Sequence, residues 1–261
     1  MHKAKKQFGQ NFLVDQNIIA DIVRAIRPVS SDNMVEIGPG LGALTRPLLQ
    51  HLDRLHVVEI DRDIIARLKT DYPQEQIVIH EGDALKFDLD GLAAPLRIVG
   101  NLPYNISSPL LFHFAAYASR ITDMHFMLQN EVVERMVAEP STPQYGRLSV
   151  MLQYRFHMEK LLDVPPQSFR PAPKVDSAIV RMIPMASKDI TVTDEKLFSE
   201  VVMAAFGQRR KTLRNTLRAY LGEADLAQLG IDAQLRAENL SYTEFAKITR
   251  WITSQGLERA A

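Results

Sequence analysis

Short apolar runs alternate with longer helical stretches over the first half of the chain, and this alternation limits the folds that the chain can adopt. Five runs read as buried strands: "MVEIG", "LHVVEID", "QIVIHEGD", "LRIVGN" and "MHFMLQ". Residues 45–52 and 63–72, which lie between them, are long enough to form helices, and the apolar residues of Gln16–Ile26 recur at helical spacing. Strands that alternate with helices form a parallel sheet covered on both faces. The sequence therefore predicts an α/β fold.

The pattern changes in the second half of the chain. The runs "LSVMLQYRFHMEKLLDV" and "SAIVRMIPM" read as strands, but the proline-rich loop "PPQSFRPAPKVD" joins them without a helix. This arrangement indicates an antiparallel pair at one edge of the sheet. After "ASKDITVTD" the chain reads as helical to its end. We therefore predict a sheet domain over residues 1–187 and a small helical domain over residues 188–261.

Composition excludes several kinds of chemistry. The 261 residues include 31 basic and 31 acidic side chains, so any site for a polyanion must be a local patch. The absence of cysteine excludes disulfides, thiolate zinc sites, a cysteine nucleophile and cysteine-held iron–sulfur clusters. The seven histidines never form a helical pair with a nearby acid, so we predict no metal site. No apolar run has the length of a membrane span or a signal peptide, and we expect a monomeric cytoplasmic protein without a membrane partner.

A glycine-rich turn follows the first strand and predicts a nucleotide-like ligand. In "VEIGPGLGALT", Gly38, Gly40 and Gly42 let backbone amides approach a ligand. Glu59 ends the second strand 21 residues after Gly38, at the distance where an acid accepts the two ribose hydroxyls of an adenosine. Asp83, at the end of a third strand, could accept a hydrogen bond from the adenine amino group, although such a residue is more often a helix cap. These residues fit a nicotinamide cofactor as well as S-adenosylmethionine.

The segment "NLPY" follows the fourth strand, at the carboxyl edge of the sheet where ligands of such folds bind. An exocyclic adenine nitrogen is a poor nucleophile because its lone pair is delocalised into the ring. The Asn101 side-chain oxygen and the Leu102 carbonyl can accept its two hydrogens, which favours a pyramidal nitrogen with a localised lone pair. Pro103 fixes the direction of that carbonyl, and Tyr104 offers a face on which an unstacked base can lie. No strong general base is required, because the nitrogen becomes acidic only after it has taken the methyl group.

One segment of the C-terminal part carries positive charge without acidic partners. Residues 201–222 contain no acid. We expect one helical stretch to carry the basic residues Arg209, Arg210, Lys211, Arg214 and Arg218 beside an apolar stripe of Leu213, Leu217 and Leu221. A run of charge is usually a solvated face, but the lack of acidic partners favours a phosphate-binding surface. Lys3, Lys5 and Lys6 could add to it.

Several motifs, taken in order, resemble those of one family. "NLPY" is similar to the Asn-X-Pro-Tyr loop of amino-methyltransferases. The segments "QFGQNFL", "VEIGPGLGALT", "VVEIDRD", "GNLPYNIS", "FRPAPKVDSAIVR" and "FGQRRKTLRN" resemble the ribosomal RNA adenine dimethyltransferases over nearly the whole chain. The resemblance implies a Rossmann-like methyltransferase sheet of seven strands, one of them antiparallel, followed by a small helical domain that binds RNA or the ribosome.

The resemblance also implies roles for individual residues. Tyr104 and Phe169 would sandwich a flipped adenine, although Phe169, an aromatic residue that we expect to be exposed between prolines, could equally be a loop anchor. Asn101 would touch both the cofactor and the target nitrogen. The cofactor, S-adenosylmethionine, would be bound at its methionine end by Asn11 and Leu13, beside it by Gly38 and Gly40, at the ribose by Glu59 and at the adenine by Asp83.

Four other functions compete with the one that the resemblance implies. Within the family, the motifs are most similar to the bacterial small-subunit branch, which dimethylates two adjacent adenosines near the 3′ end of 16S rRNA, so we expect small-subunit rRNA and the 30S particle as partners. The related large-subunit enzyme that confers antibiotic resistance shares the catalytic motifs, but "FGQRRKTLRN" and the helical tail favour the small-subunit branch. A DNA adenine methyltransferase is disfavoured, and no DNA partner is expected. A ribosome-assembly factor without catalysis is an alternative of another class, and a nicotinamide oxidoreductase leaves "NLPY" unexplained.

Overall fold

The computed structural model describes residues 10–186 and 192–256, which fall into two compact units. The first unit comprises Met1–Val133 and Met158–Pro184, and the second comprises Glu134–His157 and Met185–Ala261. The second unit therefore contains residues 134–157, whereas the sequence predicted a first domain over 1–187 and a second over 188–261. The later boundary, near residue 185, is close to the predicted one.

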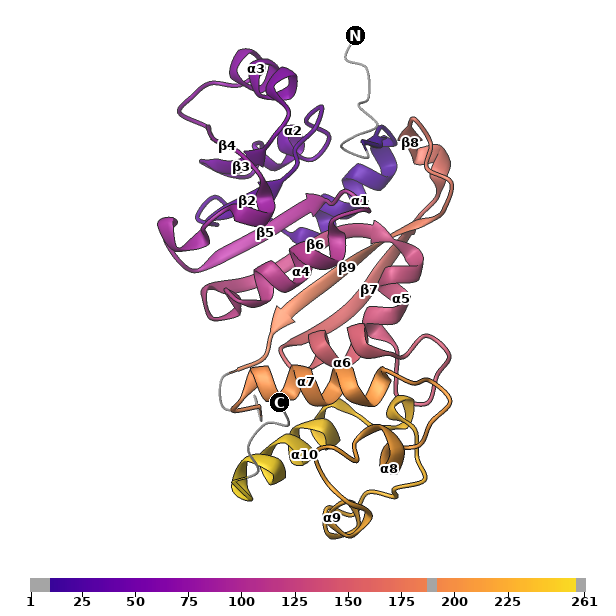
Figure 1. Cartoon of the computed structure of the whole chain (residues 1–261). Helices are drawn as coiled ribbons and strands as arrows, with labels where there is room; N and C mark the ends of the chain where they lie inside the picture. Colours follow the sequence, from indigo (N-terminus) through magenta and orange to yellow (C-terminus); the bar gives the residue numbers. More distant parts are fainter. Residues whose placement is uncertain (1–9, 187–191, 257–261) are drawn as a thin grey trace. The chain divides into compact units, whose positions relative to one another are not determined.

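The first unit is built on a mixed sheet of seven strands in the order β4-β3-β2-β5-β6-β9-β7 (Figure 1). Strands β2, β3, β4, β5 and β6 pair in parallel with their neighbours, and β9 pairs with β6 in the antiparallel sense. This confirms the predicted α/β fold with an antiparallel pair near one edge. The strands are β2 (Met34–Ile37), β3 (Leu55–Glu59), β4 (Ile77–Glu81), β5 (Leu96–Asn101), β6 (Ile121–Gln129), β7 (Phe156–Val164) and β9 (Ser177–Pro184).

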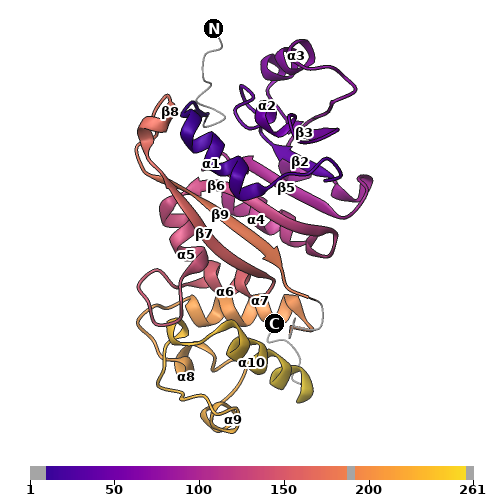
Figure 2. The same ribbon diagram turned by 180° about the vertical axis from the view of Figure 1, so that it is seen from behind.

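Helices cover both faces of this sheet, as expected for strands that are apolar on both sides. All four residues of β2 are buried, and three of them, Met34, Val35 and Ile37, are apolar. Helix α4 lies over the face seen in Figure 1, and helix α1 lies over the opposite face, seen in Figure 2. The helices of this part of the chain are α1 (Gln16–Ile26), α2 (Thr45–Leu48), α3 (Arg62–Asp71), α4 (Ser107–Ala115) and α5 (Asn130–Val137).

A second, two-stranded sheet joins the N-terminal motif to the proline-rich loop. Strand β1 (Phe12–Leu13) pairs in the antiparallel sense with β8 (Phe169–Arg170), and Leu13 lies opposite Phe169. The chain then enters α1 through Asp15, whose carboxylate accepts hydrogen bonds from the backbone N–H groups of Asn17 and Ile18 and so caps the helix. This pairing holds "QNFL" beside the carboxyl edge of the large sheet.

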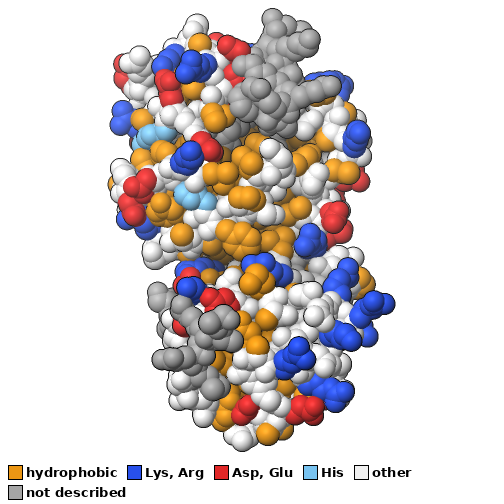
Figure 3. All heavy atoms as spheres, viewed as in Figure 1, with side chains coloured by type: hydrophobic (Ala, Val, Ile, Leu, Met, Phe, Trp, Pro, Cys, Tyr) orange, Lys and Arg blue, Asp and Glu red, His pale blue; other side chains and the backbone are white. Residues whose placement is uncertain are grey.

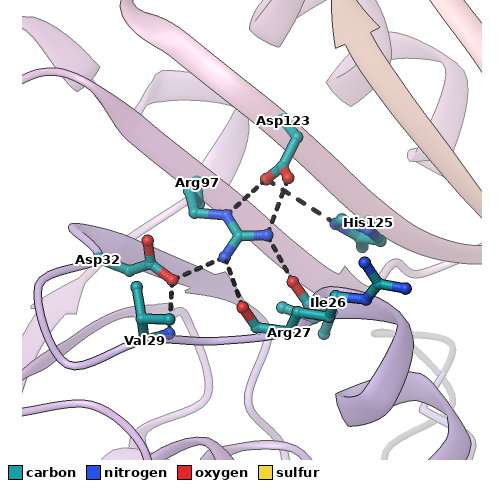
Figure 4. Close-up of polar contacts among 7 residues, drawn as sticks. All are labelled: Ile26, Arg27, Val29, Asp32, Arg97, Asp123 and His125. Carbon is teal, nitrogen blue, oxygen red and sulfur yellow. Dashed lines mark hydrogen bonds and ion pairs between the residues drawn. The ribbon is translucent and has the colours of Figure 1, made fainter.

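A partly buried arginine lies at the amino-terminal end of the central strand β5 and binds residues of several elements (Figure 4). Arg97, at the start of β5, donates two hydrogen bonds to the Asp123 carboxylate at 2.8 Å each and one to Asp32 at 2.6 Å. It also donates to the backbone carbonyls of Ile26 and Arg27, where α1 ends. The guanidinium thus ties α1 to the sheet. Because it binds the Asp123 carboxylate through two hydrogen bonds, we assign Arg97 a structural role.

The second unit is helical and has its own apolar core. Its helices are α6 (Arg147–Gln153), α7 (Glu195–Phe206), α8 (Leu213–Thr216), α9 (Glu223–Gln228) and α10 (Tyr242–Ser254). Phe198, Val201, Leu217 and Phe245 are fully buried in the core. The run that begins "LSVMLQ", which we predicted as part of a strand, forms helix α6, and the strand begins only at Phe156. Within residues 10–186 and 192–256, no helix combines the length and the apolar character needed to span a membrane.

Candidate active site

A cavity of about 290 Å³ lies at the carboxyl ends of β2, β3 and β5, in the first unit. It is lined by residues from the N-terminal motif, the glycine turn, the ends of the second and third predicted strands, and the "NLPY" loop. With two exceptions, Gly42 of the glycine turn and Phe169, the cavity brings together the residues that we predicted for catalysis or cofactor binding: Asn11, Leu13, Gly38, Gly40, Glu59, Asp83, Asn101, Leu102, Pro103 and Tyr104. The fold thus collects segments that are far apart in the sequence.

The glycine turn packs closely against its neighbours. Gly40 has a φ of 56°, and a Cβ atom there would lie 3.2 Å from the ring of Phe12. Gly42 has a φ of 83°, and a Cβ atom would lie 2.5 Å from the hydroxyl of Tyr72. A side chain at either position would therefore meet both a strained backbone and a steric contact. The turn leads into α2, which has only four residues, Thr45–Leu48, and is shorter than the predicted 45–52.

Glu59 is a buried carboxylate at the end of β3, with 7% of its surface exposed. Its Oε1 accepts hydrogen bonds from the backbone N–H groups of Ile60 and Asp61, at 2.8 Å each. Burial raises the pKa of Glu59, and the backbone N–H groups of Asp61, Ile60 and Gly40 oppose that rise by stabilising the charged form. A carboxylate has about four lone-pair sites, so Glu59 can accept further hydrogen bonds from ligand hydroxyls.

Asp83 is a helix cap, which is one of the two roles that we considered from the sequence. Its carboxylate caps the short 3₁₀ helix Ala84–Lys86 by accepting a hydrogen bond from the backbone N–H of Leu85 at 3.0 Å. The residue also lines the cavity. Beside it lie two apolar residues that we did not predict, Ile60 and Leu85. Ile60 is 49% exposed although it directly follows a buried strand. The sequence signal that could have identified it is its position next to Glu59, the carboxylate predicted to bind the ribose.

The side-chain amide of Asn101 has a defined orientation. Its Nδ2 donates to the backbone carbonyl of Asn11 at 2.9 Å, which fixes Nδ2 as the side that faces β1. The amide oxygen, Oδ1, is then the acceptor that Asn101 presents at the cavity. The preceding Gly100 lets β5 approach β2, because a Cβ atom there would lie 2.6 Å from the Ile37 carbonyl oxygen. The N-terminal motif and the "NLPY" loop are thus joined by one hydrogen bond.

Tyr104 is also held in place. Its hydroxyl lies 2.6 Å from the Ser177 hydroxyl, and its carbonyl accepts a hydrogen bond from Ser107 at 3.1 Å. Burial raises the pKa of Tyr104, so the phenol stays protonated at neutral pH. We did not predict the contact with Ser177, which is the first residue of β9 and lies 73 positions further along the chain.

Phe169 differs from the prediction. Its side chain is 0% exposed and packs in the apolar core of the first unit with residues such as Leu13 and Val164. The expectation of an exposed aromatic residue between prolines is therefore wrong, because the residue belongs to β8 and its side chain faces inward. Phe169 does not line the cavity in this structure.

A second buried carboxylate lines the same cavity. We did not predict it from the sequence. Glu36 in β2 is 2% exposed, and its Oε2 accepts a hydrogen bond from the Thr45 hydroxyl at 2.6 Å. Burial, supported by the neighbouring Glu59, raises the pKa of Glu36 to about 7, although the hydrogen bond from Thr45 opposes the rise. Glu36 therefore titrates near neutral pH. No group of three potential metal ligands occurs among the residues that the structure describes.

The basic residues of the second unit are exposed, but they do not lie on one helix as predicted. Helix α7 ends at Phe206, and α8 spans only Leu213–Thr216. Arg209, Arg210 and Lys211 lie in the turn between these helices, and Figure 3 shows Lys and Arg side chains gathered over this segment. Arg214 lies in α8, 3.5 Å from Glu223, and Arg218 follows that helix. The predicted apolar stripe, Leu213, Leu217 and Leu221, is buried in the core.

The cavity offers the kinds of groups that an adenosine cofactor requires. Glu59 and Asp83 supply carboxylates at neighbouring strand ends, and Ile60 and Leu85 supply apolar surface for a base. A nicotinamide dinucleotide cofactor would leave the oriented Asn101 amide without a role. The fold and the cavity together define an S-adenosylmethionine-dependent methyltransferase of the kind that acts on amino groups.

Comparison with known proteins narrows this class. The family model described as "Ribosomal RNA adenine dimethylase" matches residues 1–254. "Ribosomal RNA small subunit methyltransferase A" of Aromatoleum aromaticum is 63% identical over 254 residues, covering 97% of this chain and 96% of the relative. The protein of the same name from Thiobacillus denitrificans is 60% identical over 255 residues, covering 98% and 100%.

Two solved structures share the fold over more than nine-tenths of the chain. A dimethyladenosine transferase from Plasmodium falciparum has a TM-score of 0.82 at 26% identity and covers 94% of this chain and 98% of its own. The 23S rRNA methyltransferase ErmE has a TM-score of 0.72 at 25% identity and covers 93% and 100%. This chain belongs to the ribosomal RNA adenine dimethylase family, whose members are S-adenosylmethionine-dependent enzymes.

Proposed function

We propose that the protein transfers methyl groups from S-adenosylmethionine to the exocyclic amino groups of two adjacent adenosines near the 3′ end of small-subunit rRNA. The product would be a pair of dimethyladenosines. The proposal is supported by the relatives at 60–63% identity that are named for the small ribosomal subunit, whereas identity to the 23S rRNA enzyme is 25%. We further propose that the protein acts in the cytoplasm as a monomer, that its partner is the 30S particle and not DNA, and that it contributes to small-subunit biogenesis.

The orientation of the Asn101 amide is the observation that carries the mechanism. Because Nδ2 is engaged by the Asn11 carbonyl at 2.9 Å, Oδ1 is the atom available to accept a hydrogen from the target amino group. The carbonyl of Leu102 would accept the second hydrogen, and Pro103 fixes its direction. Two acceptors in these positions localise the nitrogen lone pair and point it at the cofactor. When bound, S-adenosylmethionine supplies an electrophilic methyl group on its sulfonium sulfur.

The proton released by the reaction needs no strong base from the protein. After methyl transfer, the amino nitrogen carries a positive charge and loses its proton readily to water. Tyr104 does not serve as a base, because burial raises its pKa and keeps the phenol protonated. The proposed role of Tyr104 is to hold one face of the flipped base by stacking, with its hydroxyl fixed by Ser177.

The remaining residues of the cavity would hold the cofactor. We propose that Asn11, Leu13 and Gly38 surround its methionine end, that Gly40 lies beside it, that Glu59 accepts from the ribose and Asp83 from the adenine, and that Ile60 and Leu85 pack on the adenine faces. In the second unit, we propose that the exposed residues Arg209, Arg210, Lys211, Arg214 and Arg218 bind phosphate groups of the rRNA.

The experiment that tests this function is methylation of ribosomal particles with a labelled cofactor. Under-methylated small and large subunits are incubated with the protein, and the modified adenines are mapped. We expect two adjacent adenines of the small subunit to be dimethylated. Modification of the large subunit alone would overturn the proposed substrate.

Two variants of Asn101 test the mechanism. Asn101→Ala removes the acceptor, and Asn101→Asp keeps the shape but places a carboxylate oxygen 2.9 Å from the Asn11 carbonyl, where no hydrogen bond can form. We expect both variants to lose methyl transfer while RNA affinity stays near that of the wild type, since neither change touches a phosphate contact. Near-normal turnover by a folded Asn101→Ala variant would refute the mechanism.

A further inference from the structure

A second cavity adjoins the active-site cavity in the first unit. It has a volume of about 870 Å³ and lies between helix α1 and the segment 41–50, which contains α2. Four residues line both cavities: Phe12, Leu13, Leu41 and Ala43. An occupant of the second cavity would therefore rest on β1 and the glycine turn, the same elements that form one wall of the active site. The mechanism described above makes no use of it.

The charged side chains that line this cavity are all positive. Its lining includes four arginines, Arg24, Arg27, Arg46 and Arg67, and no aspartate or glutamate. Arg24 and Arg67 form exposed ion pairs outside the lining, with Asp21 and Asp71. Within residues 10–186 and 192–256, neither Arg27 nor Arg46 has a carboxylate partner. Arg46 donates a hydrogen bond to the Tyr72 hydroxyl, but this neutral group does not balance its charge. We call this cavity the arginine groove.

Several arginines and no carboxylate along one groove favour the binding of an anion there. Arginine binds phosphate through two parallel hydrogen bonds, which makes a phosphate group the fitting anion. The nine N-terminal residues carry three lysines and no carboxylate side chain, so they do not supply an anion. We therefore look for the anion in another molecule.

The lining of the groove is partly apolar and partly polar. Ile19, Ala20 and Val23 of α1 supply apolar surface, and Gln16 and Gln50 add amide groups. A nucleotide chain presents this combination, since it has charged phosphates joined by sugars and bases with apolar faces. The volume lies within the range of about 300–1,000 Å³ that is usual for ligand sites. A surface of solvated arginines alone would lack the apolar part.

We propose that the arginine groove binds the sugar–phosphate backbone of the RNA substrate next to the target nucleotide. The proposal rests on the proposed function, because it assumes that the protein binds ribosomal RNA. It adds an RNA contact in the same unit as the active site, separate from the basic segment at 209–218. Docking of the strand against β1 and the glycine turn would hold the target base at the adjoining cavity.

Two matched pairs of variants test the groove. Ala20→Glu adds a carboxylate to the lining without removing an arginine, and Ala20→Gln has nearly the same size without the charge. The double variant Arg27→Gln with Arg46→Gln removes the two arginines that have no carboxylate partner among the described residues. As a control, Arg54→Gln with Arg62→Gln makes the same charge change at exposed positions of this unit outside the groove. Circular dichroism and calorimetric cofactor affinity check that each variant is folded.

The measurement is the affinity for under-methylated small subunits as a function of salt. For Arg27→Gln with Arg46→Gln, we expect the slope of log affinity against log salt to flatten by about 1.4–1.8, or about 0.7–0.9 per lost phosphate contact. Ala20→Glu should weaken binding by about tenfold at low salt, where charge interactions are least screened. Ala20→Gln and the Arg54 and Arg62 control should bind like the wild type, and cofactor affinity should not change.

The outcomes separate this proposal from the proposed function. If the wild type neither binds nor methylates the small subunit, the proposed function fails. If the wild type does both but the groove variants have the slope of the control, only the groove proposal is overturned. The free nucleotide ADP is the second probe. If ADP binding is lost in Arg27→Gln with Arg46→Gln while RNA affinity is that of the wild type, the groove is a mononucleotide site and the proposal is overturned.

Discussion

Glu36 provides a sharp test of the electrostatics of the active-site cavity. The residue is 2% exposed, and burial raises its pKa from 4.5 to about 7. Between these pH values Glu36 is protonated in the folded protein, whereas it is ionised in the unfolded chain. Stability contributed by Glu36 is therefore complete below pH 4.5 and is lost as the pH rises through 7. Each pKa unit corresponds to about 1.4 kcal/mol, so ionised Glu36 costs about 3 kcal/mol at alkaline pH.

Glu36→Gln removes this titration while keeping an oxygen that can accept from the Thr45 hydroxyl. We expect the free energy of unfolding of Glu36→Gln, minus that of the wild type, to rise by about 3 kcal/mol between pH 5 and pH 8. The difference between two proteins is used because other groups titrate too. His125, for example, acts in the opposite direction, since burial lowers its pKa to about 4. Glu75→Gln, at an exposed position, is the control.

The assay must follow the first unit. The single tryptophan, Trp251, lies in α10 of the second unit, so its fluorescence would report the wrong part of the chain. Hydrogen exchange of β2 during urea unfolding reports the strand that carries Glu36. Parallel curves for the wild type and Glu36→Gln between pH 5 and pH 8 would show that Glu36 is already ionised at low pH, and the account of its burial would be wrong.

Two further predictions concern ligand binding. Glu59→Ala should weaken S-adenosylmethionine binding by about 1–3 kcal/mol in calorimetry, because two ribose hydroxyls lose a charged acceptor; unchanged affinity in a folded variant would remove the assigned role. Replacement of Arg209, Arg210 and Lys211 by Ala should flatten the salt slope of RNA binding by about 0.7–0.9 per lost phosphate contact and leave cofactor affinity alone; parallel salt slopes would identify these residues as a solvated face.

The sheet could be predicted because strands buried on both faces leave short runs in the sequence that are rich in apolar residues, as in "MVEIG" and "LHVVEID". The same signal failed for "LSVMLQ". Leu148, Val150, Met151 and Leu152 are all buried in α6, so this short helix shows no polar face and its apolar run reads as a strand. Periodicity alone does not separate a buried strand from a buried helix of seven residues.

The prediction that one helix carries the basic residues 209–218 was wrong for a different reason. Its charges and leucines follow helical spacing, but Gly207 is the C-cap of α7 and Thr212 is the N-cap of α8, so the backbone between them forms a turn. Glycine after an apolar helix was the available signal. The pairing of β1 with β8 had no local signal at all, because each strand has two residues and the partners Phe12 and Arg170 are far apart in the chain.

Phe169 is the residue for which the sequence and the structure disagree most about function, and two substitutions separate the possible roles. Because the side chain is fully buried, Phe169→Ala should destabilise the protein by about 3–5 kcal/mol, and lost activity in that variant would not distinguish packing from catalysis. Phe169→Leu keeps most of the buried volume and should cost less than about 1.5 kcal/mol.

We expect Phe169→Leu to keep turnover near that of the wild type, because a ring that packs in the core has no free face for a base. Tyr104→Leu is the matched variant at the cavity, and it should lose about 1–3 kcal/mol of base stacking. Steady-state methylation of small subunits by the two leucine variants makes the comparison. If Phe169→Leu remains folded but loses as much turnover as Tyr104→Leu, the prediction is wrong. The ring of Phe169 would then have to become exposed when RNA binds, although it is buried in the free protein.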